Sequence, residues 1–328
     1  MIRSLLESIF SISLVLFLVG NLSAMGLQVR LADAITPLRN ARFVMATLVG
    51  GFVIGPALAY LVVLLIPMEQ PYATGVLLLG MAPAAPFLPL VVKKANGDLG
   101  AATGLMLLAS LGTILILPFG VPLVEPNLPV SAWSIAKPLL SLVLLPLAVG
   151  IFIKSTWDTA ADRIYRYVKA ITTVVTIVFL AMVLIRNFKG FIGSVGSHAL
   201  LSQLLFVPAL AVAGHLIAIG MSDPKRSVLS LGMCTRNIGA AAAVVGTNGD
   251  QRIMMMLVIS TLVTVGFSFA VASWYARRGR QRPLHDRAEM RVQLQSPPIV
   301  IPTERCASGS ELVFPLQEFR DSIPPRGI

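Results

Sequence analysis

The sequence predicts an all-α polytopic membrane protein of about nine transmembrane helices in two inverted repeats, with two broken helices that cross. Three observations predict this class. Of the 328 residues, 56% are hydrophobic and 12% are charged, and the mean hydropathy is +0.83, whereas a soluble domain carries about 25% charged residues. The apolar residues form runs long enough to cross a bilayer. One motif within these runs also occurs twice, 152 residues apart.

Nine segments are apolar enough to span a membrane, since about 20 predominantly apolar residues cross it as a helix. They are roughly residues 7–28, 42–66, 71–96, 99–123, 131–153, 165–187, 199–221, 226–248 and 252–275. Residues 1–24 have an alternative interpretation as a signal peptide, because Arg3, an apolar run and Ser23-Ala24 follow in that order. The full-length counterpart of the first segment at 165–187 favours retention of this segment in the mature protein.

The loops decide the orientation. Lys and Arg residues lie mostly after the odd-numbered segments, among them Arg39, Lys94, Lys154 and Lys225. Because cytoplasmic loops carry such an excess, we expect an integral protein of the cell (inner or plasma) membrane with a cytoplasmic C-terminus. The net charge of +11 then reflects topology, and no nucleic-acid partner is expected. Residues 276–328, rich in Arg, Gln, Ser and Pro, are predicted to form a disordered basic cytoplasmic tail.

The duplicated motif relates two halves of the chain. Val76–Met81, followed after fourteen residues by Asn96-Gly97-Asp98, recurs as Val228–Met233 and Asn248-Gly249-Asp250 with the same gap. This offset maps the first four segments onto the last four, five spans apart, so the halves have opposite orientations. We therefore divide residues 1–275, the transmembrane domain, into repeats of roughly 7–123 and 165–275 linked by the helix 131–153. Such a duplication is typical of secondary transporters.

Both repeated segments are interrupted near their centres. Pro83, Pro86 and Pro89 lie within seven residues of segment 71–96, and each removes an amide donor, so a continuous helix is not expected there. The counterpart in segment 226–248 is the polar cluster Thr235-Arg236-Asn237. Paired interruptions in two halves indicate a transporter's binding site, where half-helix N-termini would direct amides at an anion. The predicted substrate-binding residues are Arg236, Asn237, Thr235, Ala84, Ala85 and Pro86.

Arg236 is the only charged residue near the centre of a span. A charge there costs about 2.5–3.5 kcal/mol on insertion scales, so it normally faces a cavity or a partner. Two roles stay open, contact with a bound anion and a structural cross-link to the carbonyls of segment 71–96, and they are compatible. Asn21 and Ser23 are further candidates to line the same cavity. The histidines are scattered and form no cluster with a nucleophile or an acid, so an enzyme is not expected.

Four stretches resemble the bile acid:sodium symporter family. They are Met25-Gly26-Leu27, Pro56, Gly75–Pro83 with Gly97-Asp98, and Arg226–Asn237 with the alanine-rich turn that follows. Spread over residues 5–275, the resemblance implies inverted repeats that form a panel and a core domain. It also implies broken helices that cross in the core, organic anions bound beside the crossing, and uptake driven by sodium. Members with nine spans lack the first helix, which agrees with the unpaired segment 131–153.

The chain departs from this family where the resemblance implies sodium ligands. It has Leu88-Pro89 for a Ser-Asn pair, Ala102 and Met106 for hydroxyl residues, Gly51 for a glutamine, and Arg236-Asn237 for a Gln-Asn pair. No acidic residue occurs between Pro224 and Gly249. No metal site or cofactor is expected; sodium stays possible, although its expected ligands are largely missing. Our hypothesis is that the guanidinium of Arg236 stands where family members place a bound cation.

The predicted function is secondary transport of a small organic anion by alternating access around the crossing of segments 71–96 and 226–248. Membrane lipid is the other expected partner. The alternative is a non-transporting sensor or scaffold derived from the same fold, which the missing sodium ligands also favour.

Overall fold

The computed structural model describes residues 2–124, 132–186, 198–246 and 250–280. Helices make up nearly all of this part of the chain, which contains no strand and one isolated β-bridge. Asn248 and Gly249 of the second motif, and the predicted tail from residue 281, lie outside the described residues.

Sixteen helical elements follow one another. They are α1 (Ile2–Gly26), α2 (Leu31–Leu38), α3 (Ala41–Val49), η1 (Gly50–Ile54), α4 (Gly55–Leu65), α5 (Gln70–Gly80), α6 (Leu88–Lys94), α7 (Leu99–Val124), α8 (Ala132–Pro138), η2 (Leu139–Leu144), α9 (Leu145–Thr156), α10 (Asp158–Arg186), α12 (Ala199–Ile217), α13 (Asp223–Cys234), α14 (Ile238–Val245) and α15 (Gln251–Arg280).

Six helical stretches of the described residues are long and apolar enough to cross a membrane. Each falls on a predicted segment: Glu7–Gly26, Ala41–Leu65, Leu99–Pro122, Ala132–Thr156, Ala199–Ile217 and Gln251–Gly279. Of the three other predicted segments, 71–96 and 226–248 are each divided into two short helices. The third, 165–187, lies in α10, whose first turns carry several charged residues. The protein is therefore a helical integral membrane protein, while the count of nine spans stays a prediction.

Two π-helical turns interrupt spans that the sequence predicts as regular helices. The first, η1, ends two residues before Pro56, and the second, η2, ends two residues before Pro146. A proline has no amide hydrogen to donate to the carbonyl four residues back, and its ring clashes with that carbonyl. A wider π-turn before the proline accommodates this loss, so both spans continue as α4 and α9 after the interruption.

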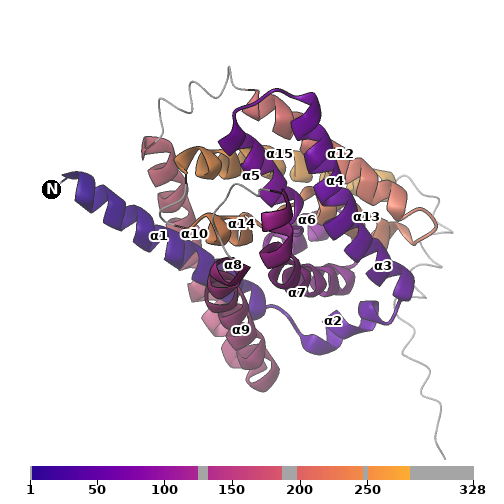
Figure 1. Ribbon diagram of the computed structural model, residues 1–328. Coiled ribbons are helices and arrows are strands. Elements are labelled where there is room, and N and C mark those ends of the chain that lie inside the picture. The colour runs from indigo at the N-terminus through magenta and orange to yellow at the C-terminus, as the bar shows by residue number, and fades with distance from the viewer. Residues whose placement is uncertain (1, 125–131, 187–197, 247–249, 281–328) are drawn as a thin grey trace, which may run out of the picture. The chain divides into compact units, whose positions relative to one another are not determined.

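The helices pack as two groups, which Figure 1 shows on opposite sides of the molecule. The first group contains α1, α9 and α10. Here the backbones of α1 and α9 touch: a Cβ on Gly26 would clash with the carbonyl oxygen of Leu147, and one on Gly150 would lie 2.7 Å from that of Ser23. The second group contains α3 to α7 and α12 to α15. The two interrupted segments both belong to the second group.

Helix positions agree with the spacing of the sequence repeat at one place in particular. α15 begins at Gln251, 152 residues after α7 begins at Leu99, and each follows an interrupted segment. The opposite orientation of the halves stays a prediction.

Candidate functional site

The two interruptions lie against each other and pair through their backbones. Pro83 and Arg236 form an antiparallel bridge. The amide of Ala84 donates to the carbonyl of Thr235 at 2.9 Å, and the amide of Asn237 donates to the carbonyl of Ala82 at 2.8 Å. Backbone freed from a helix inside a membrane must find partners within the protein, and here each break supplies them to the other. We call this contact the crossing.

Arg236 extends from the crossing and is fully buried. Its Nη1 donates to the carbonyl oxygen of Gly80 at 3.3 Å, and its guanidinium carbon lies 5.5 Å from the ring centre of Phe206. A Cβ on Gly55 would lie 3.2 Å from both terminal nitrogens, so the glycine gives the guanidinium its space. The side chain therefore links the polar break to α4, α5 and α12, as expected of the cross-linking role.

The neighbours of Arg236 also hold the break together. The side-chain oxygen of Asn237 accepts from the amide of Ala240 at 3.1 Å and caps α14. The hydroxyl of Thr235 donates to the carbonyl of Leu231 at 2.8 Å, which closes the end of α13, and the Ala85 amide donates to this hydroxyl at 3.4 Å. Both side chains make local bonds that shape the crossing.

Ala84 adopts the left-handed conformation, with φ of 62°. A residue with a Cβ is disfavoured in this region because of contact with the neighbouring carbonyl. The hydrogen bond from its amide to the carbonyl of Thr235 across the crossing holds Ala84 in this conformation. Strain of this kind concentrates at binding sites and switch regions.

A cavity of about 330 Å³ lies beside the crossing, and we call it the crossing cavity. Its wall combines α1, α10 and α15 with residues of both breaks. Much of it is apolar, including Phe17, Phe87 and Phe269. The polar lining residues are Asn21, Lys169, Thr173, Thr176, Thr261 and Arg236. An apolar chamber with few polar groups is the usual form of a small-molecule site.

The structure brings three of the six predicted site residues to this cavity, Ala85, Pro86 and Arg236. Ala84, Thr235 and Asn237 belong to the crossing but do not line the cavity. The contacts of the Arg236 guanidinium, Gly55, Gly80 and Phe206, are likewise absent from the lining. The charged end of Arg236 therefore points to the side of the crossing away from the cavity. Of the two further candidates, Asn21 lines the cavity and Ser23 does not.

The sequence prediction did not include the contribution of α10. Lys169, Thr173 and Thr176 recur at intervals of four and three, which places them on one face of a helix. Asn21 Nδ2 donates to the hydroxyl of Thr176 at 3.3 Å and joins α1 to this face. A polar stripe at helical spacing within an apolar span is a signal that could have identified them.

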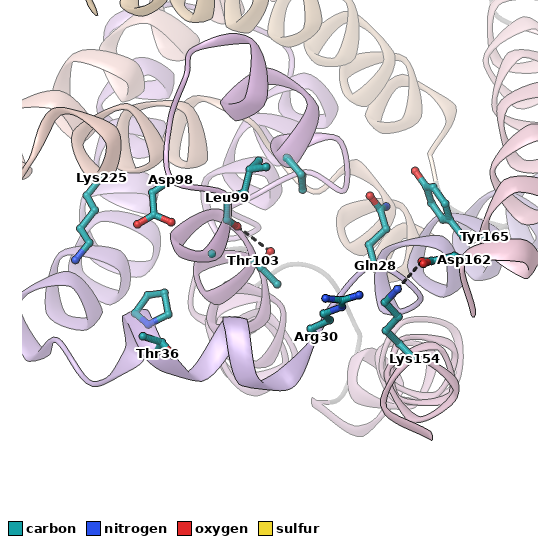
Figure 2. Close-up of a pocket in the computed structure, with 13 residues that line it drawn as sticks. Gln28, Arg30, Thr36, Asp98, Leu99, Thr103, Lys154, Asp162, Tyr165 and Lys225 are labelled. Atoms are coloured by element: carbon teal, nitrogen blue, oxygen red, sulfur yellow. Dashed lines mark hydrogen bonds and ion pairs between the residues drawn. The ribbon is translucent and has the colours of Figure 1, made fainter. Parts of the chain in front are cut away.

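A second, more polar cavity of about 780 Å³ lies at the predicted cytoplasmic ends of the helices. Figure 2 shows Lys225 and Asp98 at one end of it and Lys154 with Asp162 at the other. Asp98 accepts from the amide of Ala101 at 2.9 Å and caps α7. This cavity contains groups of both charges.

Lys154 connects α9 to α10 at one edge of the polar cavity. Its Nζ lies 2.7 Å from Oδ1 of Asp158 and also pairs with Asp162, and Arg30 contacts the other oxygen of Asp158 at 2.7 Å. The hydrogen bond from Lys154 and the charge of Arg30 hold the pKa of Asp158 below its ordinary value. These ion pairs fasten α9, α10 and the segment before α2 together.

Comparison with known proteins agrees with this architecture. The family model described as the sodium bile acid symporter family matches residues 14–194, from α1 through α10. No curated protein matches the chain. The match covers more than half of the chain and agrees with the helical membrane fold described above. Members of this family are transporters of organic anions and not enzymes. The chain belongs to the sodium bile acid symporter family.

Proposed function

We propose that this protein is a secondary transporter of small organic anions and that the crossing cavity holds the substrate. The observation that carries the proposal is an apolar cavity bounded by two broken helices in a chain of this family. Only α1 and α10 of the first helix group line it, together with residues of the second group. Movement of α1, α9 and α10 against the other helices would therefore open and close it, which is alternating access.

The chemistry of the cavity supports an anion with an apolar body. Lys169 supplies a positive charge, and Asn21, Thr173 and Thr176 supply hydrogen bonds on the same side. Phe17, Phe87 and Phe269 supply apolar surface for the rest of the molecule. The N-terminal residues of α14, Ile238 and Gly239, also line the cavity. The positive end of a helix dipole lies there, which favours a negative group nearby.

We propose that binding does not require sodium. Sodium prefers several oxygen ligands, as other hard cations do. Most of the positions where the family resemblance implies such ligands are apolar here, and Leu88, Ala102 and Met106 are buried. Arg236 occupies the crossing with a fixed charge, and its bond to the Gly80 carbonyl braces the break without an ion. A cation beside this guanidinium would be repelled.

Nine spans, halves of opposite orientation and a cytoplasmic C-terminus complete the proposal. They are supported by the sequence repeat and by the matched starts of α7 and α15. Accessibility of single cysteines to a membrane-impermeant reagent, placed in turn at each predicted loop, would test every one of these features.

The first test measures the melting temperature of the purified full-length protein in the presence of each of a panel of carboxylates and sulfonates. Each anion is added once as its sodium salt and once as its potassium salt. Stabilisation by an anion in either salt supports a sodium-independent site. Stabilisation only in sodium would show that the missing ligands are supplied elsewhere and that symport with sodium operates. Chloride is held constant throughout.

A charge variant locates the site. Lys169→Gln removes the positive charge from the crossing cavity, whereas Lys93→Gln removes one from an exposed position on α6 that does not line it. We expect the dissociation constant of a stabilising anion to rise about tenfold in the first variant only, as for loss of a charge-assisted hydrogen bond. An equal effect of both would place the anion elsewhere.

A non-transporting sensor would bind the anion in the same way as a transporter, but it would not carry the anion across the membrane. Net uptake of the stabilising anion by proteoliposomes supports transport. Tight binding without flux would instead support a sensor or scaffold, which the replaced sodium ligands also favour.

A further inference from the structure

Two of the three guanidinium nitrogens of Arg236 lack a hydrogen-bond partner among the described residues. They are Nε and Nη2, although the side chain is fully buried. The single bond of Nη1, at 3.3 Å, goes to a neutral carbonyl. Buried charges are normally paired with an opposite charge. Within the described part of the chain, no carboxylate is bonded to this one.

Other fully buried polar groups near Arg236 also lack partners. Both side-chain polar atoms of Gln203 in α12, and the hydroxyl of Thr264 in α15, have no hydrogen bond within the described residues. Gln203 and Phe206 are three residues apart on the buried face of α12, so they are neighbours on the helix surface. The ring of Phe206 packs against the guanidinium, and Gln203 lies one turn of α12 before Phe206.

Thr264 lies at the level of the turn of α12 that contains Phe206. The first turns of α12 and α15 both meet the loop before α5, through His198 bonded to the carbonyl of Pro67 and Arg252 bonded to Glu69. Near their other ends, His215 bonds to Tyr275 at 2.6 Å. The two helices therefore run in the same direction, and the offset in residue number is 54 between His198 and Arg252 and 60 between His215 and Tyr275. This range places Thr264 opposite residues 204–210 of α12, which include Phe206.

From these groups we propose a binding site for a small inorganic anion of the halide class, with chloride as its ligand. Arg236, Gln203 and Thr264 would form it, on the side of the crossing away from the crossing cavity. Nε and Nη2 of Arg236, Nε2 of Gln203 and the hydroxyl of Thr264 are all able to donate. A water molecule satisfies donors but leaves the charge unbalanced, and a sodium ion is repelled by it. A single negative charge satisfies both requirements.

This site is distinct from the organic-anion site. Neither Gln203 nor Thr264 lines the crossing cavity. Thr261, one turn before Thr264 on α15, does line it. Substitution of Thr261 should therefore affect a ligand in the crossing cavity, and substitution of Thr264 should affect a ligand in the halide site. The two variants are matched controls for each other.

The test is chlorine NMR line broadening with the purified full-length protein, while chloride replaces gluconate at constant ionic strength. Thermal stability is followed in the same titration. We expect saturable broadening and stabilisation by chloride. Arg236→Gln should abolish both, and Gln203→Leu and Thr264→Val should each raise the dissociation constant of chloride about tenfold, as for loss of one hydrogen bond to an ion. The two conservative variants keep the test valid if Arg236→Gln fails to fold.

Thr261→Val should leave chloride binding unchanged and weaken binding of the organic anion. Broadening no greater than in a protein-free sample, or broadening unaffected by Gln203→Leu and Thr264→Val, overturns the halide site. Competition between chloride and the organic anion, with both weakened by Thr261→Val, also overturns it, because one site would then hold both. The halide site can fail while organic-anion binding persists, so the two proposals are judged separately.

Discussion

The two breaks in the core differ in what each brings to their contact. The break between α5 and α6 contains Pro83 and Pro86, which have no amide hydrogen, and it offers the carbonyls of Gly80 and Ala82. The break between α13 and α14 exchanges backbone hydrogen bonds with it in both directions, and it adds a charged donor, the guanidinium of Arg236. The two breaks therefore differ in the prolines of the first and in the charged donor of the second.

This difference shows that the breaks are complementary and not interchangeable. A proline break alone leaves carbonyls that need donors within the membrane, and a polar break alone leaves a buried charge without partners. Each removes part of the cost of the other. Arg236 stabilises the crossing because it donates a hydrogen bond to a carbonyl of the proline break. Its positive charge strengthens that bond.

The largest effect is expected from removing the donor. Arg236→Gln should reduce organic-anion uptake by proteoliposomes about tenfold or more, because the crossing loses its charge-assisted bond, worth about 1.5–3 kcal/mol. Arg236→Lys retains the positive charge but lacks the planar guanidinium, so its uptake should lie between that of the unchanged protein and that of Arg236→Gln. Unchanged uptake by the Arg236→Gln variant would contradict the role that we assign to the fixed charge.

A second variant changes the distance between the breaks and keeps their chemistry. Gly55→Ala places a Cβ 2.7 Å from the Gly80 carbonyl oxygen and 3.2 Å from the guanidinium. We expect a loss of about 1–3 kcal/mol in the free energy of unfolding, as for other overpacked sites. Gly266→Ala is the control, since no atom lies within 4 Å of its Cβ. Equal stability of the two variants would contradict the close approach.

The strain at Ala84 distinguishes the proline break from the polar one. Ala84→Gly relieves a left-handed conformation with φ of 62° and should raise the unfolding free energy by about 1 kcal/mol. Ala82→Gly is its counterpart at a residue without positive φ and should give no gain. Calorimetric unfolding of both proteins in the same detergent measures the difference. A gain in the second variant and none in the first would show that the strain is not at Ala84.

The smallest effect is expected outside the crossing, at Asp158. Its pKa is lowered below the ordinary 3.8 by the bond from Lys154, so its ionised form stabilises the folded state. This contribution is fully present above that value and is lost as the pH falls through the lower pKa of the folded protein. Asp158→Asn should therefore lower the melting temperature slightly near neutral pH, and the difference should disappear in acid. A difference that persists in acid would rule out the ionic origin.

Much of the fold could be predicted from the sequence because the membrane imposes strong rules. Segment lengths follow the bilayer thickness, and six predicted spans coincide with long helices. The three prolines from Pro83 to Pro89 predicted one break, and the repeat directed attention to Arg236 in the other. The short helix α2 and the π-turns before Pro56 and Pro146 were not predicted, because hydropathy is insensitive to local hydrogen bonding.

The site was predicted less completely. Ala85, Pro86 and Arg236 line the crossing cavity, but the direction of the Arg236 side chain depends on Gly55 and Phe206, which are remote in sequence. The polar stripe of α10 that contains Lys169 marks a distinct face in the sequence, but the stripe does not show which helices that face meets. Which helices meet is a tertiary property.

The contact between Gly26 and Gly150 has a consequence for biosynthesis. α1 emerges from the ribosome before α9, and its Gly26 meets backbone that is made 124 residues later. At about 5–20 residues per second, this interval lasts roughly 6–25 s. During that time α1 must remain in the lipid without its partner, so its own apolar length has to keep it there. A nascent chain arrested before Leu145 would contain the first broken helix and would lack the surface against which α1 docks.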